Sequence, residues 1–155
     1  MKNIKKYALI ALTGILFASC LGRAIGPNAG ESRGSLTANV DGSSWKSQDV
    51  TAVTLFGSLI LTGDRNDDSN FSITFLGSEP QVGTYTLPSE GENILSGITF
   101  TNKDGESYIP VSGELKITKF RDNSVVEGEF EFEGTDFNGN TVSIKNGKFD
   151  VTIAF

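Results

Sequence analysis

The sequence has no histidine and a single cysteine, Cys20, among its 155 residues. Without histidine, the chain cannot build a Ser-His-Asp or Cys-His catalytic arrangement, and histidine-based zinc sites and most other transition-metal sites are also excluded. A lone cysteine cannot form a disulfide within the chain, so the stability of the folded domain must come from a packed core. The abundant side chains that remain for acid–base chemistry are carboxylates.

The sequence also lacks an apolar run long enough to cross a membrane. The run from Tyr7 to Phe17 falls short of the roughly 20 apolar residues that span a hydrocarbon core of about 30 Å. A lysine-rich head precedes this run, and two small residues follow it directly. This order predicts a cleaved secretory signal peptide over residues 1–19.

The end of that segment, Phe17-Ala18-Ser19-Cys20, resembles the lipobox of bacterial lipoproteins, although Phe17 stands where leucine is usual. In that class the chain is cut just before the cysteine, here between Ser19 and Cys20, and the cysteine is acylated. Several acyl chains, at about 0.8 kcal/mol per buried CH₂, would hold the protein on a membrane. We therefore expect a lipid anchor at Cys20. The alternative is an ordinary signal peptide with a cysteine that follows the cleavage site by chance.

Removal of the signal would leave a strongly acidic chain. Three of the 13 basic residues lie in the signal, so ten basic and all 19 acidic residues remain, a net charge of about −9. Such a surface repels nucleic acid and anionic head groups, so we expect no nucleic-acid partner. Residues 20–34 have the composition of a flexible tether. No acidic cluster of the kind that directs related lipoproteins to the cell surface follows Cys20, and we expect an outer-membrane protein that faces the periplasm.

Helical periodicity is scarce after the tether. Short alternating segments recur instead, separated by turn residues. Leu36–Val40 leads into an Asp41-Gly42 turn, Phe71 and Phe75 share one face of a strand, and Glu106–Pro110 and Glu114–Lys119 are predicted as separate strands. We predict one all-β domain over residues 35–155, a single antiparallel meander of about nine or ten strands. A lipocalin-like barrel and a two-sheet β-sandwich both fit, and the scarcity of long crossovers favours the barrel.

The C-terminal residues give the most definite strand pairing. Val142–Lys145 and Lys148–Ile153 flank Asn146-Gly147, a favoured two-residue hairpin loop. A hairpin in this register would place Ile144 opposite Phe149, so that the apolar residues of both strands share one face.

Five segments, taken in order, carry a family resemblance: Val40–Trp45, Gly83–Tyr85, Ser112–Thr118, Val126–Phe132 and Ile144–Val151. Together with the lipobox, they resemble the uncharacterised bacterial lipoprotein family DUF6252, which is common in Bacteroidetes. The resemblance covers essentially the whole mature domain. It implies a lipid-anchored β domain of unknown function and supplies no catalytic residues.

Carboxylates are concentrated in two places. Four glutamates alternate along Glu127–Glu133, and neighbours on one strand face lie about 6.5–7 Å apart, a spacing compatible with a glycosidase pair. The alternative, which we favour, is a solvated face opposite Phe130 and Phe132, with Lys116 and Lys119 across from it. The loop Asp64–Asn70 places oxygens at alternate positions but lacks the glycine and glutamate of a calcium loop, and we expect a hairpin loop there. We therefore expect no catalytic residue, metal or cofactor.

Five aromatic residues are candidates for the lining of a ligand cavity: Trp45, Phe71, Phe75, Phe100 and Phe130. A barrel of eight strands is just wide enough to be filled by such side chains or to hold one small ligand, and aromatic residues at strand period more often form core. The expected function is that of a non-enzymatic, lipid-anchored domain that binds a small apolar ligand, a glycan or a protein of the envelope. A structural or assembly role without a small ligand is the alternative, and a carboxylate hydrolase is the third hypothesis.

Overall fold

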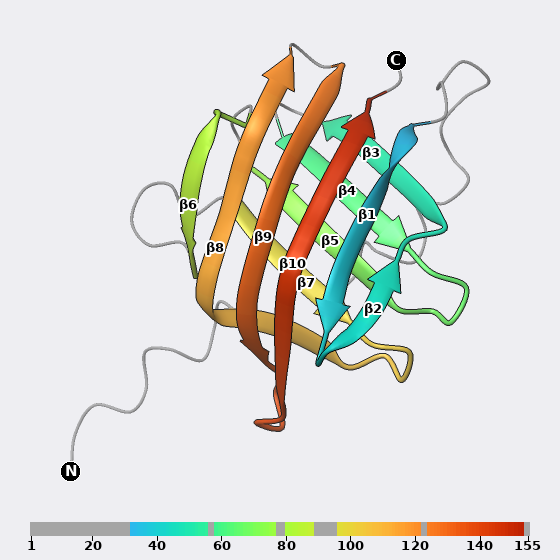
Figure 1. Ribbon diagram of the computed structural model, residues 1–155, viewed down its shortest axis with the longest axis vertical. Helices are drawn as coiled ribbons and strands as arrows, with labels where there is room; N and C mark the ends of the chain where they lie inside the picture. Colours follow the sequence, from blue (N-terminus) through green and yellow to red (C-terminus); the bar gives the residue numbers. More distant parts are fainter. Residues whose placement is uncertain (1–31, 56–57, 77–79, 89–95, 122–123, 154–155) are drawn as a thin grey trace. The chain divides into compact units, whose positions relative to one another are not determined.

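The computed structural model shows an all-β domain, as the sequence predicts (Figure 1). It describes residues 32–55, 58–76, 80–88, 96–121 and 124–153, and these contain strands and turns but no helix. The strands are β1 (Arg33–Val40), β2 (Ser43–Lys46), β3 (Asp49–Leu55), β4 (Ser58–Asp64), β5 (Asn70–Phe75), β6 (Gly83–Leu87), β7 (Ser96–Thr101), β8 (Ser107–Arg121), β9 (Val125–Thr135) and β10 (Thr141–Thr152).

All the strands belong to one antiparallel sheet. Its hydrogen-bonded order is β2-β1-β10-β9-β8-β7-β5-β4-β3, and β6 pairs with β8 beside this path. The sheet curls into a half-barrel, so that β3, β4, β5 and β7 lie across the inner face of β8, β9, β10 and β1 (Figure 1). The two layers are therefore parts of one continuous sheet. This arrangement confirms the predicted antiparallel domain of about nine or ten strands.

Strand β8 turns the corner between the layers. Its first residues, Ser107 and Tyr108, pair with β7, whereas Gly113–Ile117 pair with β6. Strand β9 pairs with β8 from Ile109 through the corner to Arg121. Gly113 has φ +143°, and a β-carbon there would overlap the backbone of β9. The prediction of two separate strands in this region was wrong, because pairing with β9 continues through the corner.

The predicted hairpin at Asn146-Gly147 is wrong. Both residues lie within β10, which runs unbroken between β9 and β1. Ile144 of β10 pairs with Phe132 of β9, and Gly147 pairs with Phe130. Lys145 and Asn146 on β10 therefore together face a single residue of β9, Glu131. This is a β-bulge, and Asn146 adopts φ +51° in it.

The bulge explains why the sequence misled. It inserts one extra residue, so the inward side shifts from the even positions Val142 and Ile144 to the odd positions Phe149 and Val151, and all four are buried. A two-residue hairpin loop would give the same alternation. Asn-Gly suits either structure, because both need a residue with positive φ.

The true hairpin connects β9 to β10 through residues 136–140, a turn that the sequence analysis missed. The Asp136 carboxylate accepts hydrogen bonds from the backbone N–H groups of Asn138 and Asn140, both at 2.8 Å, and from the Asn140 side-chain amide at 2.7 Å. Gly139 follows with φ +85°. An aspartate that hydrogen-bonds the backbone two residues on is a known turn device.

The two ends of the strand order are tied together by serine side chains. The Ser32 hydroxyl donates to the Ala52 carbonyl of β3 at 3.2 Å and accepts from the Ala52 N–H at 3.1 Å. Ser47, between β2 and β3, accepts from the Leu36 N–H of β1 at 3.0 Å. The Ser32 bonds join the residue before β1 to β3, and the Ser47 bond joins β1 to the connection between β2 and β3.

The inner face holds one hydrophobic cluster to which both layers contribute. Phe71, Ile73 and Phe75 of β5 are buried on one face, as predicted, and Phe130 and Phe132 of β9 are buried between exposed glutamates. The predicted alternation of β9 is therefore confirmed.

Candidate functional site

The five aromatic residues proposed as a cavity lining lie in the core. All are buried, and they come from β2 (Trp45), β5 (Phe71 and Phe75), β7 (Phe100) and β9 (Phe130). The structure brings three of them around a fourth, Phe71: its ring centroid lies 4.8 Å from that of Trp45, 4.7 Å from that of Phe100 and 5.3 Å from that of Phe130. Phe75 instead packs edge-on against Tyr85 of β6, at 6.1 Å. At such separations the rings are in direct contact.

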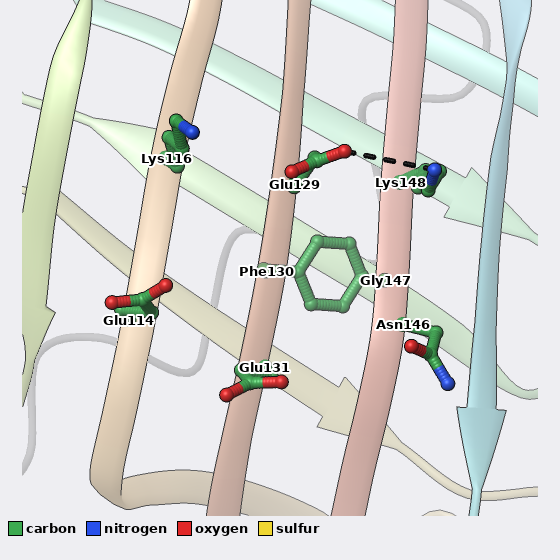
Figure 2. A pocket seen from close by; sticks show the side chains of 8 residues that line it. All are labelled: Glu114, Lys116, Glu129, Phe130, Glu131, Asn146, Gly147 and Lys148. Atoms are coloured by element: carbon green, nitrogen blue, oxygen red, sulfur yellow. Dashed lines mark ion pairs between the residues drawn. The ribbon is translucent and has the colours of Figure 1, made fainter.

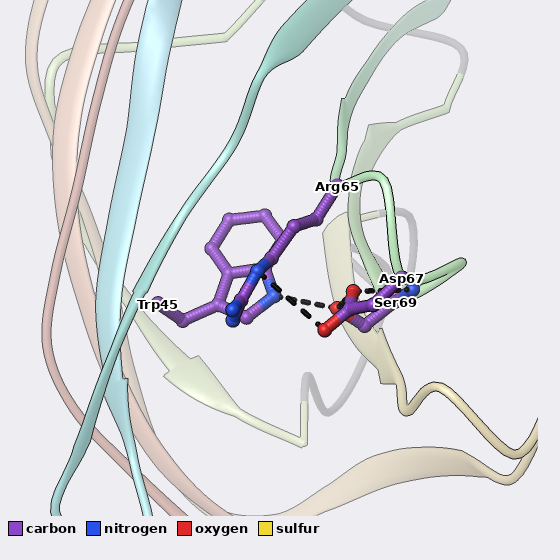
Figure 3. Close-up of polar contacts among 4 residues, drawn as sticks. All are labelled: Trp45, Arg65, Asp67 and Ser69. Atoms are coloured by element: carbon purple, nitrogen blue, oxygen red, sulfur yellow. Dashed lines mark hydrogen bonds and ion pairs between the residues drawn. The ribbon is translucent and has the colours of Figure 1, made fainter.

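A chain of hydrogen bonds links this core to the loop between β4 and β5 (Figure 3). The Trp45 indole N–H donates to the Ser69 hydroxyl at 2.8 Å, and the Ser69 hydroxyl donates to the Asp67 carboxylate at 2.5 Å. The hydrogen bond from the Ser69 side chain holds the pKa of Asp67 below its ordinary value, with Arg65 nearby adding to the effect. Ser69 is buried, so the loop seals this end of the core and satisfies the indole N–H.

This loop is the segment whose alternating oxygens suggested calcium. Within the described residues, no group of three or more carboxylate or cysteine side chains is arranged to hold a metal ion. Asp67 is engaged with Ser69 and Arg65 instead. Asp64, at the end of β4, lies opposite Asp49 of β3. Partial burial, and then the like charge of Asp49, raise the pKa of Asp64.

The glutamates of β9 lie on the outer face of the sheet, with lysines of the neighbouring strands opposite them. Lys119 of β8 forms an ion pair with Glu127, and Lys148 of β10 lies 3.6 Å from a carboxylate oxygen of Glu129. Lys116 is also the cross-strand partner of Glu129. Opposite charges across a strand pair support one another, so this face has the arrangement of a solvated sheet surface.

An open depression of about 270 Å³ lies on this outer face (Figure 2). Polar side chains from three adjacent strands line it, together with Phe130 and Gly147: Glu114 and Lys116 of β8, Glu129 and Glu131 of β9, and Asn146 and Lys148 of β10. Glu114 and Glu131 are direct cross-strand partners of the same charge, beside the β10 bulge that carries Asn146. The depression therefore offers hydrogen-bond acceptors, an amide and two ammonium groups to a polar ligand.

A second surface feature is the 136–140 turn and the corner of β8 beside it. Phe137 is 83% exposed, and Ile109 and Val111 of β8 are 50% and 54% exposed. Ile109 is the cross-strand partner of Thr135, the last residue of β9 before the turn. The sequence analysis did not select Phe137; the signal available was Asp-Phe-Asn-Gly-Asn, a turn sequence with a phenylalanine in it.

The buried Tyr108 is hydrogen-bonded to a carboxylate at this end of the domain. The Tyr108 hydroxyl donates to Glu106 at 3.2 Å. Burial raises the pKa of Tyr108, and Glu106, Asp136 and Asp41 raise it further. Burial would also raise the pKa of Asp136, but its hydrogen bonds from Asn140 and Asn138 outweigh this and hold the pKa below its ordinary value. Asp136 is therefore ionised at neutral pH.

The predicted cleavage site Ser19-Cys20, the lipidated Cys20 and most of the predicted tether lie outside the described residues. Cleavage and lipidation remain predictions. Within the described ranges, no helix has the length and apolar character to cross a membrane.

The fold and surface define an all-β domain, one curled antiparallel sheet with a clustered aromatic core and a polar outer face. The model of the family described as "Domain of unknown function (DUF6252)" matches residues 32–151, and the chain belongs to this family. The resemblance noted in the sequence is thus confirmed. Neither the curated proteins nor the solved structures contain a match to the chain.

Proposed function

We propose that this chain is a non-enzymatic, lipid-anchored protein of the cell envelope, and that its β domain binds a partner through the outer surface. The anchor is inferred from the signal sequence and from Cys20 in its lipobox-like context, with the outer membrane, facing the periplasm, as the location. The acidic composition agrees with a body that stands off from anionic lipid.

One observation favours binding at the outer surface over binding of a ligand inside the domain. The rings of Trp45, Phe100 and Phe130 all contact Phe71, so four of the five candidate cavity residues pack against one another. A small apolar ligand would have to displace one of these rings from the core, which costs packing energy. A surface partner requires no such rearrangement.

Native mass spectrometry tests this choice. The mature protein with Cys20→Ser, purified from a bacterial host, is expected to show the mass of the polypeptide alone under gentle conditions. A retained apolar molecule of defined mass would contradict the surface proposal and restore the cavity hypothesis.

The anchor has its own test. Cells that make the full chain are supplied with labelled palmitate, and the wild-type protein is expected to take up label and sediment with membranes. Cys20→Ser should lose both properties, whereas Ser19→Ala, which keeps a small residue, should retain them. Equal labelling of wild type and Cys20→Ser would rule out acylation at Cys20.

A glycan is a second candidate ligand, favoured by the depression on β8, β9 and β10. Its carboxylates and the Asn146 amide resemble the planar polar groups that fix an oligosaccharide by hydrogen bonds. Titration with envelope glycans should then show binding that Glu131→Gln weakens at least tenfold, while Lys145→Gln, just outside the lining, leaves it unchanged.

The alternative is a structural or assembly role in the envelope with no small ligand. In that case, deletion of the protein would weaken the envelope, and variants of the depression or of the 136–140 turn would restore integrity as well as wild type does. Under the binding proposal, at least one of these surface variants fails to restore function although the protein is folded and present at normal levels.

A further inference from the structure

We propose that the surface formed by Phe137, Ile109 and Val111, here named the apolar end, docks a protein that presents an apolar pocket rimmed by lysine and arginine side chains. This inference rests on the proposed function, because it names the partner class of the surface-binding domain.

Phe137 is presented by a pre-organised turn. The Asp136 carboxylate accepts three hydrogen bonds from Asn138 and Asn140, and the Gly139 N–H donates to the Asp136 carbonyl at 3.2 Å. A large aromatic side chain on such a turn loses little conformational freedom when it enters a pocket. Aromatic residues of this kind commonly dominate the energy of protein interfaces.

The apolar end gathers most of the large apolar side chains that are exposed. Five such side chains are exposed among the described residues, and three of them are Phe137, Ile109 and Val111. The remaining two, Leu76 and Val82, follow β5 and precede β6. Strand pairing fixes the neighbourhood: Ile109 lies opposite the last residue of β9, and the turn that carries Phe137 follows directly. Clustered exposed apolar residues on a folded domain mark interaction surfaces.

The rim of the apolar end is acidic. The Asp41 carboxylate accepts a hydrogen bond from the Ser143 N–H at 2.8 Å, the Ser143 hydroxyl donates to Glu133 near the end of β9 at 2.8 Å, and Glu106 accepts from the hydroxyl of Tyr108, the residue before Ile109. None of these three carboxylates belongs to an ion pair in the part of the chain that the structure describes, where the paired carboxylates are Asp67, Glu127 and Glu129. Their negative charge is left for a partner to complement.

This charge selects among possible occupants. An anionic bilayer surface would be repelled by the carboxylates, and so would a second copy of the same acidic end. A protein pocket with an apolar floor and a basic rim satisfies both the exposed apolar side chains and the unpaired charges.

Site-specific photo-crosslinking in the cells that make the full chain tests the proposal. p-Benzoylphenylalanine is placed at position 137, and at position 152 as a control, because Thr152 is exposed at the opposite end of β10. The expected result is one protein adduct at 137 that is at least tenfold weaker at 152. Mass spectrometry should map the adduct to an apolar surface of the partner that is flanked by lysine or arginine.

Two variants separate contact from folding. Ile109→Ser with Val111→Ser should reduce the adduct at 137 at least fivefold, and Glu133→Lys should reduce it at least threefold. All should keep the unfolding midpoint of the parent, since these side chains are exposed. If the double serine variant loses its adduct only because it unfolds, its unfolding midpoint will shift, and the milder Ile109→Thr replaces it.

The other outcomes overturn the proposal. An adduct with lipid would assign the apolar end to a membrane, and an adduct with the same polypeptide would assign it to self-association. No adduct at 137, equal adducts at 137 and 152, or a partner surface without basic residues would remove the docking surface. Failure of the docking surface is separate from failure of the proposed function, which is judged by the mass of the purified protein and the labelling of Cys20. A partner crosslinked from the depression, and not from position 137, would leave the proposed function standing.

Discussion

The ring of Phe130 lies directly against the backbone of Gly147, its cross-strand partner, so closely that a β-carbon at Gly147 would overlap the ring. Two residues further along the same strands, the relationship repeats with the roles exchanged. Phe149 of β10 pairs with Gly128 of β9, and a β-carbon at Gly128 would overlap the Phe149 ring. The two rings stack at 6.4 Å. Each phenylalanine thus covers the glycine of the opposite strand.

Substitution of Gly147 by alanine is expected to destabilise the domain by about 1–3 kcal/mol, because the new methyl group must push the Phe130 ring out of its position in the core. Urea denaturation followed by tryptophan fluorescence measures the change. In a Phe130→Leu background the same substitution should cost about 1 kcal/mol less, since the ring is gone. Gly97→Ala is the matched control: a β-carbon at Gly97 meets no atom within 4 Å, and stability should change by no more than about 0.5 kcal/mol.

Asn146→Ala should cost about 1 kcal/mol, since Asn146 holds φ +51° in the bulge and alanine tolerates that region poorly. Asn146→Gly should be neutral or slightly stabilising. The exposed neighbour Lys145→Ala serves as the control, and equal effects of alanine at 145 and 146 would contradict the role assigned to backbone conformation. Chemical denaturation measures the free energy of unfolding of each variant.

Ser69→Ala is expected to destabilise the domain by about 1–3 kcal/mol, because it leaves the buried Trp45 indole N–H without its acceptor. Ser69→Thr keeps a hydroxyl and should recover part of the loss. The fluorescence emission of Trp45, the single tryptophan, reports the same site, and its maximum should shift only in the alanine variant. Unchanged stability in Ser69→Ala would show that water replaces the hydroxyl at no cost.

Asp67 makes part of the stability of this region depend on pH. Its folded pKa lies below the ordinary value of 3.8, so its contribution is present above pH 3.8 and is lost as the pH falls through the lower folded pKa. Unfolding curves from pH 7 to pH 2 should show a steeper acid loss for wild type than for Asp67→Asn. Asp68→Asn, in the same loop, provides the comparison, and identical curves for wild type and Asp67→Asn would refute the assignment.

Asp64 should show the opposite sign. Because burial and Asp49 raise its folded pKa above 3.8, its ionised form destabilises the folded state at neutral pH, and this penalty is relieved as the pH falls through the raised pKa. Asp64→Asn is therefore expected to stabilise the domain slightly at pH 7, by no more than about 0.5 kcal/mol for so exposed a group. The gain should vanish at pH 3. A loss of stability at pH 7 would contradict the prediction.

The C-terminal region shows what sequence patterns can and cannot predict. Alternation correctly placed Phe130 and Phe132 inside and the glutamates of β9 outside, because the period of a strand fixes which residues share a face. The same alternation placed Val142 and Phe149 correctly on the inner face but through the wrong structure, a hairpin instead of a bulge. The local sequence pattern is the same for a hairpin and for a bulge. Only the presence of β9 and β1 on either side of β10 distinguishes them.

The candidate sites show the same division. The five aromatic residues predicted as a cavity lining are all buried, yet whether they enclose a cavity depends on the distances between rings from four different strands, which no local pattern contains. Phe137 was missed because its exposure depends on a turn held by Asp136, inside a segment that had been given no turn. The depression depends on the register of three strands and on the bulge.

The sequence by itself determined the all-β class, the family, the inner and outer faces of the strands and the absence of histidine chemistry, because these follow from residue types and a period of two along the chain. The tertiary structure decided the strand order, the continuity of β8 around its corner and of β10 through its bulge, the contact of Phe71 with three other rings, and the exposure of Phe137. These features depend on pairings between residues far apart in the chain. Such pairings are selected by the packing of the whole sheet, which local sequence does not encode.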